Sequence, residues 1–283
     1  MENTETSHVA LPAPFPPKWA EGWGEDDFGT FAELRIGSAT MEMRWIPPGR
    51  FEMGEKGGVR DVSLTQGFWL SATQCTQTQW RELVPENPNP SLFRSDDEEE
   101  RKRDFDRRPV DQVSWDDCVA ACDALNQKRD FDGLLARLPT EAEWEYACRA
   151  GTDTDFNDGS GLNDEKTLDE LGWYDRNSGH RTHPVMEKRP NGWGLSDMHG
   201  NIWEWCSDWY GPLNTDTVED PSGPESGGNR VLRGGGFWYF ALGCRSASRN
   251  GDEPDFRDGS IGFRLALGQS LVNSSSKGGA RRA

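Results

Sequence analysis

The spacing of apolar residues predicts two strands that bracket one segment near the C-terminus. In residues 261–267 apolar side chains occupy every second position, as in a strand with one buried face. The run 230–233, with the sequence Arg-Val-Leu-Arg, predicts a second strand. Between them, residues 234–260 combine three consecutive glycines with large aromatic side chains, so turns are expected there. These aromatics form either a buried plug or an exposed recognition surface.

Capping patterns predict three helices upstream of this segment. Thr76 is a candidate N-cap for a short helix. Ser114 with Asp117, and Thr140 with Glu143, have the spacing of a capping box, in which two side chains satisfy free amides at a helix start. Apolar residues recur at helical spacing after each cap, which supports all three helices.

Other stretches predict strands and a loop. Residues 41–54 have the pattern of a β-hairpin, with the Pro-Pro-Gly of positions 47–49 as its turn. Residues 62–64 and 67–70 predict another strand pair. Residues 152–192 are rich in Asp, Asn and Gly, and they predict a long irregular loop.

Composition limits the class of protein. The chain has 283 residues, enough for a substantial core, and its 32 glycines and 17 prolines predict many turns. A net charge of −18 disfavours nucleic acid and anionic membrane as partners. No apolar run is long enough to span a membrane, and the proline-rich N-terminus does not resemble a signal peptide, so a cytoplasmic location is expected.

The cysteines and histidines give weak metal signals. The six cysteines are dispersed without a CxxC pair, and Cys118 and Cys122 would share one helix face. Burial as small apolar residues is favoured for them over metal binding. His180 and His183 lie three apart, but no further ligands stand at a zinc-like spacing, so a polar surface role is favoured.

The stretch 197–206 contains oxygen donors around a glycine turn. Asp197 and Glu204 flank the turn, and the carbonyl groups of Gly200 and Ile202 could complete a cage for calcium, which prefers six to eight oxygen ligands. The alternative is that Glu204 only accepts hydrogen bonds beneath the neighbouring tryptophans. The spacing leaves both interpretations open.

A series of motifs runs in a fixed order through residues 41–267. They are 45–54 (WIPPGRFEMG), 67–70 (GFWL), 108–110 (RPV), 113–115 (VSW), 137–147 (RLPTEAEWEYA), 200–205 (GNIWEW), 230–235 (RVLRGG) and 262–264 (GFR). The series resembles the formylglycine-generating-enzyme (sulfatase-modifying factor) superfamily. This resemblance implies an α+β, C-type-lectin-like fold of that type, loop-rich, with two main helices and short antiparallel sheets. It also places Asp197, Gly200, Ile202 and Glu204 at a structural calcium site.

The same resemblance bears on oxidase chemistry. The oxidases of the family hold copper with two thiolates after the paired glycines, whereas residues 236–250 contain only Cys244. The iron-dependent branch takes histidines from an additional helical domain, and this chain has four histidines in all. Calcium is therefore expected as a cofactor, copper and iron are not, and no catalytic residue is assigned.

The C-terminal segment further resembles the variable proteins of diversity-generating retroelements, which use this fold to display a diversified binding surface. Residues 244–247 match their fixed Cys-Arg-Ser-Ala motif, while Trp238 and the tail 268–283 depart from the usual pattern. The expected ligand contacts are Phe237, Trp238, Tyr239, Phe240, Leu242, Gly243, Ser248, Phe256, Asp258 and Ser260.

The resulting prediction is a non-catalytic protein that binds a protein or other macromolecular ligand through this surface. The first alternative is a metal-dependent oxidoreductase of the formylglycine-generating type, acting on a cysteine or thiol substrate. The second is a structural partner in a larger assembly. The predicted organisation is a partly flexible N-terminal arm (1–40), one domain (41–268) and a disordered tail (269–283).

Overall fold

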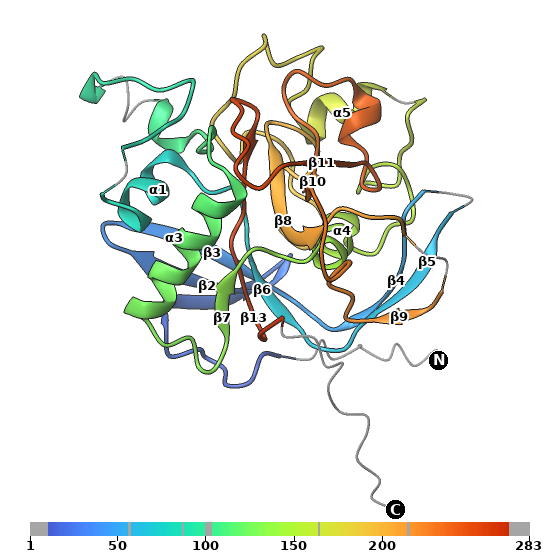
Figure 1. Ribbon diagram of the computed structural model, residues 1–283, viewed down its shortest axis with the longest axis horizontal. Coiled ribbons are helices and arrows are strands. Elements are labelled where there is room, and N and C mark those ends of the chain that lie inside the picture. The colour runs from blue at the N-terminus through green and yellow to red at the C-terminus, as the bar shows by residue number, and fades with distance from the viewer. Residues whose placement is uncertain are drawn as a thin grey trace, which may run out of the picture.

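Figure 1 shows the computed structural model, which describes residues 11–55, 58–86, 88–99, 104–163, 165–213 and 216–271. Long loops join short helices and strands, so the predicted loop-rich α+β class is confirmed. The helices are α1 (Gln77–Leu83), α3 (Trp115–Lys128), α4 (Glu141–Arg149), α5 (Glu165–Leu171) and the 3-10 turns η1 (Phe105–Arg107) and η2 (Ala241–Cys244).

The main sheet is antiparallel and has the strand order β1-β2-β3-β6-β13-β7. Its strands are β1 (Ala20–Asp26), β2 (Gly29–Ile36), β3 (Ala39–Ile46), β6 (Phe68–Ser71), β13 (Ala266–Gly268) and β7 (Leu135–Arg137). Residues 20–36, assigned above to an N-terminal arm, thus belong to the domain as β1 and β2. Trp19, just before them, is buried edge-on against Trp69 at 5.5 Å between ring centroids.

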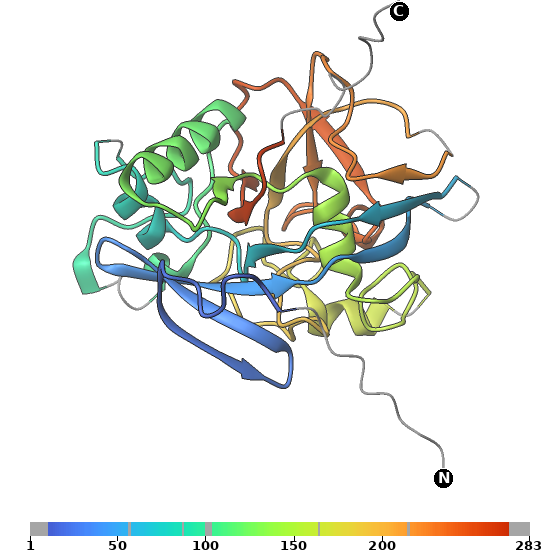
Figure 2. The same cartoon turned by 90° about the horizontal axis from the view of Figure 1, so that it is seen from below.

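Two smaller sheets complete the domain. One has the order β11-β10-β8-β12 and the other β4-β5-β9. Their strands are β8 (Trp203–Trp209), β10 (Arg230–Arg233), β11 (Arg249–Asp252) and β12 (Ile261–Gly262), then β4 (Gly49–Met53), β5 (Arg60–Leu64) and β9 (Val218–Glu219). Figure 2 shows the blue strands β1–β3 on one side of the molecule and the orange strands of the β10 sheet on the other.

The predicted hairpin over 41–54 is wrong. β3 pairs with β2 and β6, whereas β4 pairs with β5, so the chain changes sheets at Pro47 and Pro48. The predicted pairing of 62–64 with 67–70 fails in the same way, because β5 and β6 also lie in different sheets. The strand at 230–233 is confirmed as β10.

The predicted strand over 261–267 is two strands. β12 pairs in parallel with β8, while β13 pairs with β6 and β7 in the main sheet. Every residue from 261 to 268 is buried, including Arg264, because this segment passes through the core between the two sheets. The alternation of apolar residues over 261–267 therefore does not mark a strand with one exposed face.

Local helix signals are confirmed. Thr76, Ser114 and Thr140 each cap a helix with a complete capping box, because a side chain three residues later also bonds back to the cap amide. The predicted loop 152–192 contains a helix, α5, whose Leu168 and Leu171 are buried in a small cluster with Cys244. Within the described residues, no helix has the length and apolar character needed to cross a bilayer.

Two fully buried arginines stand at the ends of the segment between β10 and β12. The Arg233 guanidinium pairs with Glu145 of α4 and lies 3.6 Å from Glu141. The Arg264 guanidinium donates to both oxygens of Glu204, at 2.6 and 2.9 Å. A buried charge is tolerated only when it is paired and hydrogen-bonded, so these carboxylates determine where both ends of the segment lie.

Glu145→Gln tests this anchoring. The change keeps the side-chain volume but removes the charge that faces Arg233 and Arg149. Arg149 would lose its buried partner and Arg233 would keep only Glu141 at 3.6 Å, so the free energy of unfolding should fall by about 3–5 kcal/mol in urea titrations. The matched control is Glu21→Gln, whose exposed pair with Arg35 at 4.0 Å should be worth about 0–1 kcal/mol. Equal effects of the two changes would contradict the anchoring role.

Candidate functional site

The segment from Gly234 to Ser260 begins with a turn that only glycine accommodates. Gly234 and Gly235 have φ of 99° and 77°, in the left-handed region. A Cβ atom at Gly235 would lie 2.6 Å from the Cys244 sulfur, so this glycine also permits η2 to pack closely. In Figure 1 the segment, coloured orange to red, lies in the upper half of the molecule near α5, away from β7 and β13.

Backbone hydrogen bonds to other parts of the domain hold this segment. The Phe237 amide donates to the Asn201 carbonyl at 2.9 Å, and the Asp175 amide donates to the Tyr239 carbonyl at 3.0 Å. Further along, the Ser246 amide donates to the Asp155 carbonyl at 2.8 Å. Main-chain groups elsewhere in the domain therefore hold this backbone in part, and these contacts do not involve the exposed side chains of the segment.

Several large side chains project from this fixed backbone into solvent. Phe240 is 75% exposed, Leu242 57% and Trp238 52%, and Tyr239 and Phe256 are also exposed. Apolar side chains of this size are normally buried, and exposed ones that lie together mark interaction sites. These five side chains are therefore exposed and do not form a buried plug.

Three of the predicted contact residues do not lie on that surface. Phe237 is fully buried and packs edge-on against Phe93, with ring centroids 5.6 Å apart. Ser248 and Ser260 are also buried, and the Ser248 hydroxyl donates to the Leu242 carbonyl at 2.6 Å. These side chains support the surface from inside. The placement of Phe237 on the contact surface is corrected, because its ring faces the core.

Gly243 and Asp258 are half-buried and have structural roles. The Gly243 amide closes the η2 turn onto the Phe240 carbonyl at 2.8 Å. The Asp258 carboxylate accepts from the amide and hydroxyl of Ser260, at 2.8 and 2.6 Å, and so shapes the turn into β12.

Residues outside 237–260 also lie at this surface, and no pattern in the sequence pointed to their position there. The His180 ring lies 5.2 Å from the Trp238 ring, at an interplanar angle of 31°. Leu92 is exposed, and its side chain lies against Gly259, within 2.6 Å of where a Cβ would stand. Both come from loops distant in sequence, so only the fold brings them to this surface.

A buried carboxyl group lies beneath the Leu92 side of the surface. Asp111 is fully buried and accepts from the Leu92 amide at 2.7 Å, while its other oxygen has no hydrogen-bond partner among the described residues. Burial raises the pKa of Asp111 to about 7, and the nearby Asp258 charge adds to this rise. The support of this loop therefore contains one acid that titrates near neutrality.

The four predicted calcium ligands do come together, around a nitrogen atom. The carbonyl oxygens of Asp197, Gly200 and Ile202 and one carboxylate oxygen of Glu204 all lie 3.0–3.4 Å from Nε2 of Gln74. This set of oxygens has the chemistry that a hard cation prefers. Calcium binding by these residues stays a prediction.

The thiol groups lie in apolar surroundings. Burial raises the pKa of Cys244 and of Cys148 to about 12, and it raises that of Cys206 as well. Copper ligation in the oxidases uses thiolates, which this environment disfavours. Cys206 packs in the cluster that contains Trp144, whereas Cys244 belongs to the α5 cluster, so the two cysteines lie in different parts of the core.

Cys148 and His199 resemble a catalytic dyad but lack its properties. The sulfur lies 3.9 Å from Nε2 of His199, and both side chains are fully buried. Nδ1 of His199 bonds the Cys244 carbonyl at 2.8 Å, and its Nε2 accepts from the Asn157 amide at 3.2 Å. Burial lowers the pKa of His199 to about 4, so the imidazole is neutral and cannot stabilise a thiolate.

His183 also has a structural role. His183 stacks on Trp173 with ring centroids 3.8 Å apart, and its Nε2 bonds the Ser178 carbonyl at 2.6 Å. Among the described residues, no group of three or more Asp, Glu, His or Cys side chains has a metal-binding arrangement.

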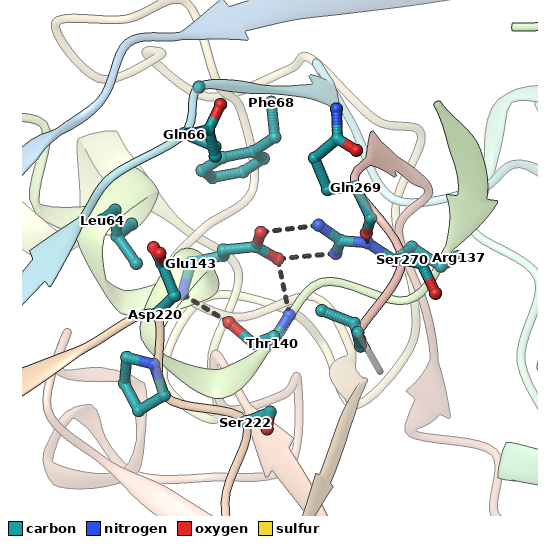
Figure 3. Close-up of a pocket in the computed structure, with 13 residues that line it drawn as sticks. Leu64, Gln66, Phe68, Arg137, Thr140, Glu143, Asp220, Ser222, Gln269 and Ser270 are labelled. Carbon is teal, nitrogen blue, oxygen red and sulfur yellow. Dashed lines mark hydrogen bonds and ion pairs between the residues drawn. The ribbon is translucent and has the colours of Figure 1, made fainter. Parts of the chain in front are cut away.

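A shallow pocket of about 220 Å³ lies elsewhere, between β6 and the start of α4 (Figure 3). Arg137 and Glu143 face each other across it through two 2.6 Å contacts, and Glu143 also accepts from the Thr140 amide at 2.8 Å. Arg137 and Glu143 are therefore bonded to each other and to the start of α4.

The difference between Phe237 and Phe240 can be measured as stability. Phe240→Ala should change the free energy of unfolding by less than about 0.5 kcal/mol, because the ring is already in water. Phe237→Ala should lower it by about 3–5 kcal/mol, because it leaves a cavity in the core. Chemical denaturation of both variants checks this, and a large loss for Phe240→Ala would restore the buried-plug interpretation.

Asp111→Asn should change the pH dependence of stability. Because the pKa of Asp111 is raised in the folded protein, the protonated side chain contributes to the free energy of unfolding. This contribution is fully present below about pH 4 and is lost as the pH rises through about 7. The free energy of unfolding of the Asn variant, relative to that of the wild type, should therefore rise by on the order of 1–3 kcal/mol between pH 5 and pH 8. Denaturation curves at both pH values measure this. The control is Asp27→Asn, at an exposed position. Its free energy of unfolding should depend on pH as that of the wild type does, because Asp111 remains in place.

Comparison with known proteins places the chain in a family. A sequence model of the Sulfatase-modifying factor enzyme 1-like domain matches residues 30–268. The formylglycine-generating enzyme of Streptomyces coelicolor is 39% identical over 182 residues, which cover 59% of this chain and 55% of that protein. That of Mus musculus is 34% identical over 200 residues, covering 66% of this chain and 48% of that protein. The chain thus spans about half the length of these relatives.

Among solved structures, the Treponema denticola variable protein 1 is similar over 83% of this chain and 98% of its own, with a TM-score of 0.73 and 32% identity. The predicted C-type-lectin-like fold of the formylglycine-generating-enzyme type is confirmed by this likeness together with the family match. The chain belongs to the family of sulfatase-modifying factor enzyme 1-like domains.

Proposed function

We propose that this protein is a non-catalytic binding protein whose ligand, a protein or other macromolecule, contacts the surface formed by Trp238, Tyr239, Phe240, Leu242 and Phe256. One observation carries the proposal: these side chains are exposed, while the backbone beneath them is bonded to the rest of the domain. Rigid aromatic side chains lose little conformational entropy on binding, so such a surface can bind without first being ordered.

Three further features support this function. The likeness to the Treponema denticola variable protein 1 extends over nearly all of that chain. A display surface on a diversity-generating scaffold must tolerate substitution, and the backbone contacts described above leave its exposed side chains free to vary. The net charge of −18 favours a partner other than nucleic acid or anionic membrane.

A library experiment tests the proposal. Randomising the five exposed surface residues should leave most variants folded, and selection against a panel of unrelated folded proteins should give binders of micromolar affinity or better. The matched control library randomises three exposed apolar residues at the main sheet: Trp23 in β1, Leu135 in β7 and Phe28 in the turn between β1 and β2. The proposal fails if the surface library is mostly unfolded, or if both libraries give binders equally often.

The second candidate function is a formylglycine-generating oxidase, which the 39% identity to the Streptomyces coelicolor enzyme favours. An oxidase of this kind would take up oxygen in the presence of Cu(I) and a cysteine-containing peptide. The purified protein should show no uptake above a Cys244→Ser control under the binding proposal. Uptake that depends on Cys244 would replace the binding function with the oxidase.

A further inference from the structure

The oxygen atoms gathered around Gln74 are arranged for a hydrogen-bond donor. Its Nε2 lies 3.0 Å from the Ile202 carbonyl oxygen and from Glu204 Oε1, 3.2 Å from the Gly200 carbonyl oxygen and 3.4 Å from that of Asp197. These lengths are those of N–H···O contacts, whereas oxygens around calcium lie 2.3–2.6 Å from the ion. Gln74 is fully buried and follows β6, so its amide reaches the turn 197–204 from the neighbouring sheet.

The Glu204 carboxylate is already paired with a buried cation. Glu204 accepts two hydrogen bonds from the Arg264 guanidinium and a third, at 2.7 Å, from the Trp144 indole. Asp197 faces Gln74 with its backbone carbonyl, while one of its carboxylate oxygens accepts from the Met186 amide at 2.9 Å. The carboxylate that does face Gln74 is therefore neutralised by an arginine, which reduces the electrostatic gain from a divalent ion.

The orientation of the Gln74 amide follows from these neighbours. With Nε2 directed at the four oxygens, its two protons are shared among them, and Oε1 is left without a partner among the described residues. If the amide were turned the other way, Oε1 of Gln74 would face these four oxygen atoms. Repulsion between the oxygens would disfavour that orientation unless a cation lay between them. One unpartnered acceptor is the smaller penalty.

We infer that the side-chain amide of Gln74 replaces calcium in this chain: its Nε2 holds together the oxygens of Asp197, Gly200, Ile202 and Glu204, and the domain folds independently of calcium at this turn. The turn matters to the candidate surface, because Asn201 within it accepts the Phe237 amide and Trp203 packs edge-on against Tyr239 at 5.2 Å. Gln74 is thus a positioning residue for that surface.

The wild-type protein provides the first test. Its melting temperature at pH 8 should be the same, within about 1 °C, in excess EGTA and in millimolar calcium, and calorimetric titration should show no stoichiometric calcium binding. A loss of several degrees in EGTA that calcium restores, or a stoichiometric binding isotherm, would overturn the inference. This comparison needs no variant, so it is decisive even if a substituted protein does not fold.

Gln74→Glu provides the second test, because it exchanges the NH2 group for an oxygen at nearly constant size. Five oxygens and a second carboxylate would then need a cation, so the melting temperature should fall in EGTA, by on the order of 5 °C or more, and rise with added calcium. The control is Gln127→Glu, on the exposed face of α3, which should match the wild type in both conditions. A Gln74→Glu protein as stable as wild type in EGTA would contradict the inference.

These outcomes are separate from the binding proposal, since melting temperature and calcium titration do not depend on any ligand of the 237–260 surface. A calcium-dependent wild type would leave the proposed binding function untouched. Conversely, failure of the library selections would leave the assignment of Gln74 unchanged.

Discussion

The pairing of two buried arginines with carboxylates of the framework is the interaction on which the rest of the structure depends. Arg233 ends β10 and pairs with Glu145, and Arg264 follows β12 and pairs with Glu204. Trp144 links the two pairs, because its indole donates to Glu204 while its ring faces Arg233 at 5.3 Å. Since an unpaired buried charge is strongly destabilising, both ends of the intervening segment have little freedom to move.

Between these anchors the domain separates a fixed backbone from exposed side chains. The main chain is hydrogen-bonded to Asn201, Asp175 and Asp155, none of which belongs to the segment, and these bonds do not involve its exposed side chains. Side chains that point inward, such as Phe237, belong to the core, whereas those that point outward are largely released from packing. This division is what the proposed binding function requires, because the exposed side chains can differ while the core stays the same.

The sequence predicted the features that depend on neighbouring residues and missed those that depend on distant ones. Capping boxes at Ser114 and Thr140 are local, and both are present. Strand partners are not local, so the pattern over 41–54 suggested a hairpin although the chain changes sheets at Pro47. The order of the motifs along the chain predicted the family and the segment that carries the candidate surface. It did not show that Phe237 faces inward, or that Gln74 reaches oxygens more than 120 positions away.

The central claim is that residues between the two arginine anchors form a variable binding surface on an invariant framework. The most direct measurement is deep sequencing of this gene, codon by codon, in a population of the organism that carries it. The account predicts amino-acid changes concentrated at exposed positions between Trp238 and Asp258, with Phe237, Arg233 and Arg264 unchanged. Changes spread evenly along the gene, or none within this segment, would contradict it.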